Sequence, residues 1–243
     1  MLTREEENKL VSDWTDAERN KLAQMHTKLM LGNAHKNLVK LIKQKSQEFA
    51  KTESEFLEEL IDMFFLHITN NSINKKYYLY KYSFEWFRFF IEKLTAEKPY
   101  EDNLGCIFHE ITNLDKKNLG QSFTPNDLSE LISALLNRSV TKIQTHRTFY
   151  EPTCGTGSLI LATIGNSDCQ VAEVTINDLD LTLVKACYIQ LALNQLINRK
   201  HKTLIIRAFN GDTLTDFSKS HLVSQCFGEQ PSDPEDSNFS TAA

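Results

Sequence analysis

The chain has 243 residues, 41% of them hydrophobic and 24% charged, a composition typical of a folded protein with one or two domains. Its formal net charge of −5 disfavours a protein that grips DNA alone through a broad basic face. The acidic, polar start excludes a secretory signal, and no apolar run approaches the roughly 20 residues of a membrane span, so no membrane partner is expected.

Five cysteines occur, an odd number without a Cys-x-x-Cys pair or a Cys/His cluster. A disulfide framework and a zinc site are therefore not expected. Reduced thiols of this kind indicate a cytoplasmic protein without a bound metal.

Residues 1–115 are predicted to form a helical N-terminal domain. Apolar residues recur at three- and four-residue steps over Asp16–Leu31 and His35–Phe65, with a break at Gly32-Asn33 and a loop at Asn70–Ser72. Nine aromatic residues then interleave with basic ones over Lys75–Leu94. This stretch is either a stacking platform for nucleic-acid bases or the aromatic core of the helical domain, and burial is the favoured interpretation.

A helix is also predicted to begin at Thr124. Thr124 is a good N-cap, Pro125 suits the first helical position, and Asp127 can complete a capping box. This capping chemistry leaves the preceding Gly120–Phe123 unexplained. An apolar stripe follows at Leu128, Leu131, Ile132, Leu135 and Leu136.

Short β-branched runs alternate with helical runs in the second half of the chain, which indicates an α/β fold with parallel strands. We expect three strands, near Thr148–Pro152, Val171–Asn177 and Thr203–Arg207, with helices near Ser158–Ile164 and Asp180–Asn198. This unit spans residues 116–227. Residues 228–243 hold four acids and no Lys or Arg, and we expect a disordered tail there.

The strongest motif runs from Glu151 to Ser158, where a strand enters a Gly-x-Gly turn that leads into a helix. Glycines allow a ligand to approach the backbone closely. The acid at Glu151 suits a cationic ligand better than a pyrophosphate, and S-adenosylmethionine carries both an ammonium and a sulfonium. A dinucleotide-binding fold is disfavoured because the third glycine of its fingerprint is missing.

Two further acids follow the ends of the next strands. Asp178 lies about 20 residues after the turn, where an acid can meet ribose hydroxyls, and Asp212 follows the third strand. The plainer interpretation is that Asp178 or Asp180 caps a helix and that Asp212 belongs to a simple turn. Three such turns at successive strand ends predict one ligand crevice.

These elements together resemble the adenine-N6 DNA methyltransferases, most of all the modification subunit of type I restriction–modification systems. Asp102–Glu110 resembles the family's D-x-x-G-x-x-(Y/F)-E helix, although His109 stands in the place of the acid. Gly120–Pro125 resembles G-Q-F-F-T-P, Glu151–Ser158 resembles D-P-A-C-G-T-G-G, and Gly211–Leu214 resembles G-D-T-L. The resemblance implies a partial Rossmann-like methyltransferase domain that binds S-adenosylmethionine. Its implied cofactor residues are Gln121, Phe123, Thr124, Pro125, Glu151, Pro152, Cys154, Gly155, Thr156, Gly157, Asp178, Leu179, Asp212 and Thr213.

The family's catalytic loop, (N/D)-P-P-(Y/F), is not found in the sequence, because no two of the five prolines are adjacent. The sequence therefore predicts no catalytic residue. The methyltransferase sheet is expected to end after its third strand, where a fourth strand would begin. Methyl transfer to adenine is expected to be absent or to depend on a partner. The implied partners are DNA, a specificity or restriction subunit, or a complementary methyltransferase fragment. The alternative is a non-catalytic interaction module that docks onto a restriction–modification or other DNA-bound complex.

Overall fold

The computed structural model describes residues 34–71, 76–111, 124–138, 145–215 and 220–229, together with a few positions between 15 and 24. Four helices come first: α3 (Ala34–Glu48), α4 (Glu53–Ile68), α5 (Lys76–Glu97) and α6 (Asn103–Ile111). The remaining elements are α7 (Asn126–Arg138), β1 (His146–Glu151), α8 (Ser158–Gly165), β2 (Val171–Asp178), α9 (Leu181–Asn198), β3 (Thr203–Asn210) and β4 (His221–Gly228). The predictions for Asp16–Leu31, Gly32-Asn33 and residues 230–243 fall mostly or wholly outside the described residues.

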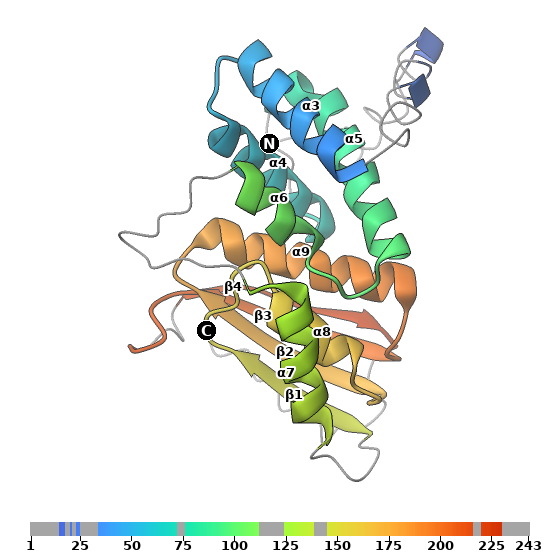
Figure 1. The fold of residues 1–243 in the computed structure, drawn as a ribbon, viewed down its shortest axis with the longest axis vertical. Helices are drawn as coiled ribbons and strands as arrows, with labels where there is room; N and C mark the ends of the chain where they lie inside the picture. Colours follow the sequence, from blue (N-terminus) through green and yellow to red (C-terminus); the bar gives the residue numbers. More distant parts are fainter. Residues whose placement is uncertain are drawn as a thin grey trace.

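The strands form one sheet in the order β1-β2-β3-β4 (Figure 1). β1 pairs with β2 and β2 with β3 in parallel, as the alternation of strands and helices predicts. The three predicted strands are confirmed, but a fourth strand, β4, was not predicted and pairs antiparallel with β3. Gly228, placed at the start of the expected tail, is the last residue of this strand.

Side chains of the sheet alternate between two different faces. Ala172, Val174 and Ile176 of β2 are buried on the face that packs against α9. Glu173, between them, points to the other face, where it pairs with His146 of β1 (3.2 Å) and Arg207 of β3. In the described part of the chain the sheet therefore has one apolar face and one face with cross-strand ion pairs.

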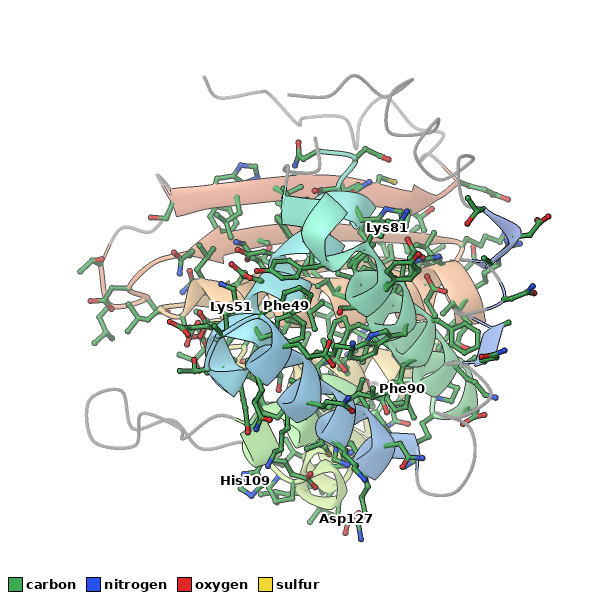
Figure 2. All side chains as sticks on the ribbon, turned by 90° about the horizontal axis from the view of Figure 1, so that it is seen from above. Phe49, Lys51, Lys81, Phe90, His109 and Asp127 are labelled. Atoms are coloured by element: carbon green, nitrogen blue, oxygen red, sulfur yellow. The ribbon has the colours of Figure 1, made fainter. Side chains whose placement is uncertain are left out.

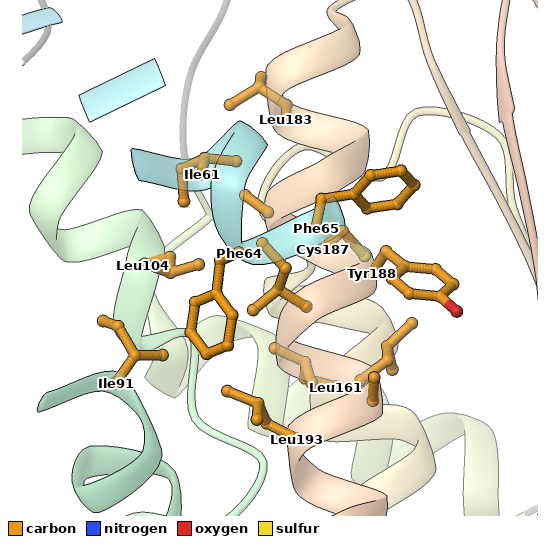
Figure 3. Packing of buried hydrophobic residues seen from close by; sticks show 14 of the residues in the cluster. Ile61, Phe64, Phe65, Ile91, Leu104, Leu161, Leu183, Cys187, Tyr188 and Leu193 are labelled. Atoms are coloured by element: carbon orange, nitrogen blue, oxygen red, sulfur yellow. The ribbon is translucent and has the colours of Figure 1, made fainter. Parts of the chain in front are cut away.

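The N-terminal helices lie on the outer side of α9 (Figure 1). Phe65 of α4 packs against Tyr188 of α9 with 5.2 Å between ring centroids, whereas Phe64 packs against Phe84 and Phe87 of α5 (Figure 3). One continuous cluster of buried apolar residues runs from the helical layer through α9 to the sheet. The helical layer is thus fixed to the α/β unit by apolar burial, the dominant favourable term in folding.

The helical pattern predicted over His35–Phe65 is two helices rather than one. Ala50 adopts a left-handed conformation (φ 52°) after α3, and Thr52 caps α4. The Thr52 hydroxyl accepts from the Glu55 N–H while the Glu55 carboxylate accepts from the Thr52 N–H, which completes a capping box. Phe49 lies between the two helices (Figure 2). Its ring packs edge-on against Tyr80 of α5, with 4.6 Å between ring centroids.

The aromatic stretch forms core, as the favoured interpretation predicts. Five of its side chains are buried in the helical layer: Tyr80, Phe84, Trp86, Phe87 and Phe90. Arg88 is paired with Glu85 and Glu92 of the same helix. These aromatic rings are occupied by packing rather than offered to nucleic-acid bases.

Helix α7 buries its polar side and exposes its apolar one. Ser129 and Ser133 are buried against α8, whereas Leu128, Leu131 and Leu135 are 46%, 58% and 59% exposed. The apolar stripe predicted from the sequence therefore exists, but it faces outward. No described helix is both long and apolar enough to cross a membrane.

Candidate functional site

The site lies where β1 ends and α8 begins. Glu151 is the last residue of β1, and a tight turn leads to Ser158 at the start of α8. Gly155 and Gly157 both have positive φ (52° and 109°), which glycine adopts without strain. The Gly157 N–H donates to the Cys154 carbonyl (2.9 Å) and closes the turn.

Asp178, the last residue of β2, faces this turn. One oxygen of its carboxylate accepts from the Gly155 N–H (2.8 Å), and the other accepts from the Asp180 N–H (3.0 Å). Asp180 caps α9 by accepting from Thr182 N–H and Leu183 N–H, which confirms the interpretation of Asp180 as a helix cap. The two strand ends are thus joined by a carboxylate that has lone pairs left for a ligand.

Asn177 ties three strand-end turns together and is fully buried. Its amide nitrogen lies within hydrogen-bond distance of the Pro152 carbonyl (3.1 Å), the Gly211 carbonyl (2.8 Å) and the Thr213 hydroxyl (2.9 Å). Its side-chain oxygen accepts from the Gly211 N–H (3.1 Å), and its backbone carbonyl accepts from the Cys154 N–H (2.8 Å). Sequence reasoning missed this residue, because its partners are far apart in the chain.

The third turn places its predicted residues in different surroundings. Asp212 is exposed and accepts from the Leu214 N–H (2.9 Å). Thr213 turns inward, and its hydroxyl donates to the Pro152 carbonyl (2.6 Å). Leu179, after β2, is 60% exposed. Asp212 and Leu179 therefore remain accessible at the same edge as the glycine turn, while Thr213 supports the turn from beneath.

The turn has open space for a ligand, and the carboxylate of Glu151 lies where it can contact that ligand. A side-chain carbon added at Gly155 finds open space within 4 Å. The Glu151 carboxylate is half-buried and accepts only weakly from the Thr153 N–H (3.5 Å). Burial raises the pKa of Glu151, the Thr153 hydrogen bond opposes this, and nearby Asp178 adds to it. Among the described residues, the groups that act on the Glu151 carboxylate include no basic side chain, so the carboxylate suits a cationic ligand.

The upstream segment approaches the turn from the other side. Gln121 and Phe123 lie outside the described residues. The Thr124 carbonyl accepts from the Ser158 hydroxyl (3.0 Å), which joins the start of α7 to the start of α8. Thr124 and Pro125 line a cavity of about 570 Å³. Its other lining residues are His35, Leu94, Lys98, Glu101, Asp102, Asn103, Gly105, Cys106, His109, Glu110 and Asn126.

Cys154 and Cys187 are both buried beside the turn. Burial raises the pKa of the Cys187 thiol, and the adjacent Cys154 raises it further. A raised pKa keeps the Cys187 thiol protonated, and a protonated thiol is a poor nucleophile, so Cys187 has a packing role. Among the described residues no group of three or more His, Cys, Asp or Glu side chains could hold a metal ion.

The Asp102–Glu110 stretch places Asp102 against the turn, although Asp102 was not among the predicted cofactor residues. Its carboxylate accepts from the Thr156 hydroxyl (2.5 Å). The signal was present in the sequence as an acid three residues before Gly105, but its partner could not be read from spacing.

The match to known proteins covers the same region. The model of the N-6 DNA methylase family matches residues 100–225, just over half of the chain. A solved protein from Listeria monocytogenes, described as a class I S-adenosylmethionine-dependent methyltransferase, has 16% identity and a TM-score of 0.52. A type I restriction–modification methyltransferase subunit from Streptococcus thermophilus has 18% identity and a TM-score of 0.37.

The alignments cover most of this chain but only part of the solved ones. They span 82% of this chain and 56% of the Listeria protein, and 84% of this chain and 45% of the Streptococcus protein. No curated protein matches the chain. The likeness to the Listeria protein shows a shared methyltransferase fold, including the expected Rossmann-like α/β arrangement behind N-terminal helices.

Proposed function

The chain belongs to the N-6 DNA methylase family, and from that premise we propose that it binds S-adenosylmethionine at the turn between β1 and α8. The observation that carries this proposal is the open space beside Gly155, flanked by two carboxylates. A ligand can contact the backbone there while Glu151 faces its cationic amino-acid portion. Asp178, held against the same turn, is close enough to share the ligand.

The remaining predicted residues fit the two ends of such a ligand. The Thr124 carbonyl accepts from the Ser158 hydroxyl at the end of the turn, and we place the methionine end between the turn and the segment that holds Thr124 and Pro125. Asp212 and Leu179 are exposed at the far strand ends, where we place the nucleoside. Pro152, Cys154 and Thr213 support the turn through backbone and hydroxyl contacts rather than through open side chains.

When bound, S-adenosylmethionine supplies an electrophilic methyl group on its sulfonium. Acceptance by adenine requires groups that take protons from the amino nitrogen and stack on the base. The sequence holds no adjacent prolines and hence no (N/D)-P-P-(Y/F) loop. We therefore propose that methyl transfer by this chain is absent or depends on a partner, and that DNA is engaged together with other subunits, such as a specificity or restriction subunit or a complementary methyltransferase fragment.

Calorimetric titration with S-adenosylmethionine and S-adenosylhomocysteine tests the proposal. We expect micromolar binding that weakens by about tenfold or more in Gly155→Ala, because the added methyl occupies the open space, and in Glu151→Gln, because the ammonium loses its counter-charge. Glu130→Gln on α7 is the matched control. It neutralises an acid whose hydrogen bond to Asn166 an amide oxygen can keep, and it should bind as the wild type does. Wild-type protein that binds neither ligand would overturn the proposal.

The second candidate is a non-catalytic interaction module within a restriction–modification or other DNA-bound complex. The exposed leucines of α7 favour it, because contiguous apolar surface is characteristic of interaction sites. The same titration separates the two candidates, since a module of this kind needs no cofactor. Cofactor binding that depends on Gly155 and Glu151 favours the first candidate, the S-adenosylmethionine-binding protein.

A further inference from the structure

We propose that Asp102, which belongs to the helical layer, is a positioning residue that holds the glycine turn in the shape required for the cofactor's amino-acid portion. This inference rests on the proposed function, because it concerns the geometry of the same site. It assigns a role to a residue outside the predicted cofactor set, and it explains why the helical layer and the α/β unit are joined at this point.

The Asp102 carboxylate is 4% exposed and receives three hydrogen bonds. One oxygen accepts from the Gly105 N–H (2.8 Å) and from the Gln190 side-chain amide (2.8 Å). The other oxygen accepts from the Thr156 hydroxyl (2.5 Å), and Thr156 lies between the two glycines of the turn. The carboxylate thus connects the start of α6, the middle of α9 and the turn itself.

Gln190 supplies a second restraint on the same residue of the turn. Its amide nitrogen also donates to the Thr156 carbonyl (2.7 Å), and its oxygen accepts from the Leu104 N–H (3.0 Å). Thr156 is therefore held at its hydroxyl by Asp102 and at its backbone by Gln190. A residue held at both its side chain and its carbonyl cannot rotate its neighbouring peptides freely, which keeps Gly155 beside Asp178.

The spacing of Asp102 and Gly105 has a steric cause. A side-chain carbon added at Gly105 would lie 2.2 Å from the nearer Asp102 carboxylate oxygen and 2.8 Å from the Thr156 hydroxyl. Only glycine at this position lets the carboxylate receive the helix N–H and the turn hydroxyl together. The acid, the glycine three residues later and the turn threonine therefore work as one unit.

The chemistry of the site favours a positioning role over a direct one. All three donors belong to the protein, and burial raises the pKa of Asp102 while its hydrogen bonds from Gln190, Thr156 and Gly105 oppose that rise. A carboxylate that already accepts three hydrogen bonds from the protein and is almost inaccessible to solvent has little capacity left to contact a ligand. Its effect on the ligand must pass through Thr156.

Two ligands, one with and one without the amino-acid portion, distinguish a loss of positioning from a loss of fold, because unfolding weakens the binding of both. Binding of S-adenosylhomocysteine, which has the amino-acid portion, is compared with binding of 5′-methylthioadenosine, which lacks it. We expect Asp102→Ala to weaken the former by about tenfold or more and the latter by less than about threefold. Asp102→Asn should bind as the wild type does, because its oxygen accepts from Gly105 and Gln190 while its amide donates to the Thr156 hydroxyl.

Two further comparisons keep the test decisive. If Asp102→Ala does not fold, Thr156→Val removes only the turn hydroxyl, and Thr156→Ser restores it; the same ligand-selective loss and rescue are expected. Thr95→Val is the control, because it deletes a buried hydroxyl bonded to the Ile91 carbonyl, in α5. It should lower stability without changing either affinity.

The outcomes also separate this inference from the proposed function. Wild-type protein that binds neither ligand refutes the proposed function and the inference with it. Wild-type binding that is unchanged in the alanine and valine variants, that falls equally for both ligands, or that is not rescued by Asp102→Asn and Thr156→Ser refutes the positioning role alone.

Discussion

Asn177 offers the sharpest test of how the crevice is held together. Replacing it with Ala removes an amide that donates to the Pro152 and Gly211 carbonyls and accepts from the Gly211 N–H. Pro152 keeps the Thr213 hydroxyl and the Gly211 N–H keeps the Asp178 carbonyl, but the Gly211 carbonyl loses this donor. Three hydrogen bonds at about 1 kcal/mol each, plus part of the cost of a buried unsatisfied carbonyl, predict a loss of about 3–4 kcal/mol.

Urea unfolding followed by circular dichroism measures this loss as a lower midpoint with an unchanged slope. Asn177→Asp sharpens the test, because it keeps the size of the side chain but turns the donor into an acceptor that faces two carbonyls. Burial raises the pKa of the new carboxyl in the folded state, so the variant is destabilised progressively more as the pH rises from about 4. A loss below about 1 kcal/mol for Asn177→Ala, or equal destabilisation of Asn177→Asp at pH 5 and pH 8, would refute this reasoning.

Three other predictions concern the frame around the site. Thr52→Ala should lower the free energy of unfolding by about 1 kcal/mol by removing the cap of α4, whereas Thr52→Ser should restore it; equal stability of all three proteins in urea would contradict the cap. Burial lowers the pKa of His201, so the unfolded state binds the proton more readily, and stability should fall as the pH drops below about 6.5. His201→Gln should flatten that part of the curve, and an identical pH profile would argue against the buried neutral imidazole. Asp62→Asn should cost less than about 1 kcal/mol, since its pair with Lys185 (2.7 Å) is half-exposed; a much larger loss in urea would show that the pair is an essential tie between α4 and α9.

The elements that the sequence predicted correctly are those whose structure is determined by residues close together in the chain. β2 and β3 follow β-branched runs, β1 combines Thr148 with two aromatic residues, and the Asp180 cap lies directly before its helix. β4 was missed because His221–Gly228 mixes polar and apolar residues, and its strand character comes from pairing with β3. The division between α3 and α4 was missed although the Thr52–Glu55 capping box is visible in the sequence, since the apolar steps continue across it.

The candidate site was predictable where a motif is contiguous and hidden where contacts are distant. The turn from Glu151 to Ser158 and the acid at Asp178 have local signatures, and the structure brings them together. Asn177 and Gln190 look like ordinary polar residues of a strand and a helix. Gln190 meets its partners across 34 to 88 residues of chain, so only the folded topology reveals its role.

The roll angle of α7 about its own axis is set by polar groups. The Ser129 hydroxyl contacts the Ser158 hydroxyl (2.7 Å), the Ser133 hydroxyl donates to the Ala162 carbonyl (2.9 Å), and both serines are buried against α8. Turning the helix to hide its leucines would break both buried hydrogen bonds and move the serine hydroxyls into water. Water therefore meets the leucines as a direct result of where the two serines find their partners on α8.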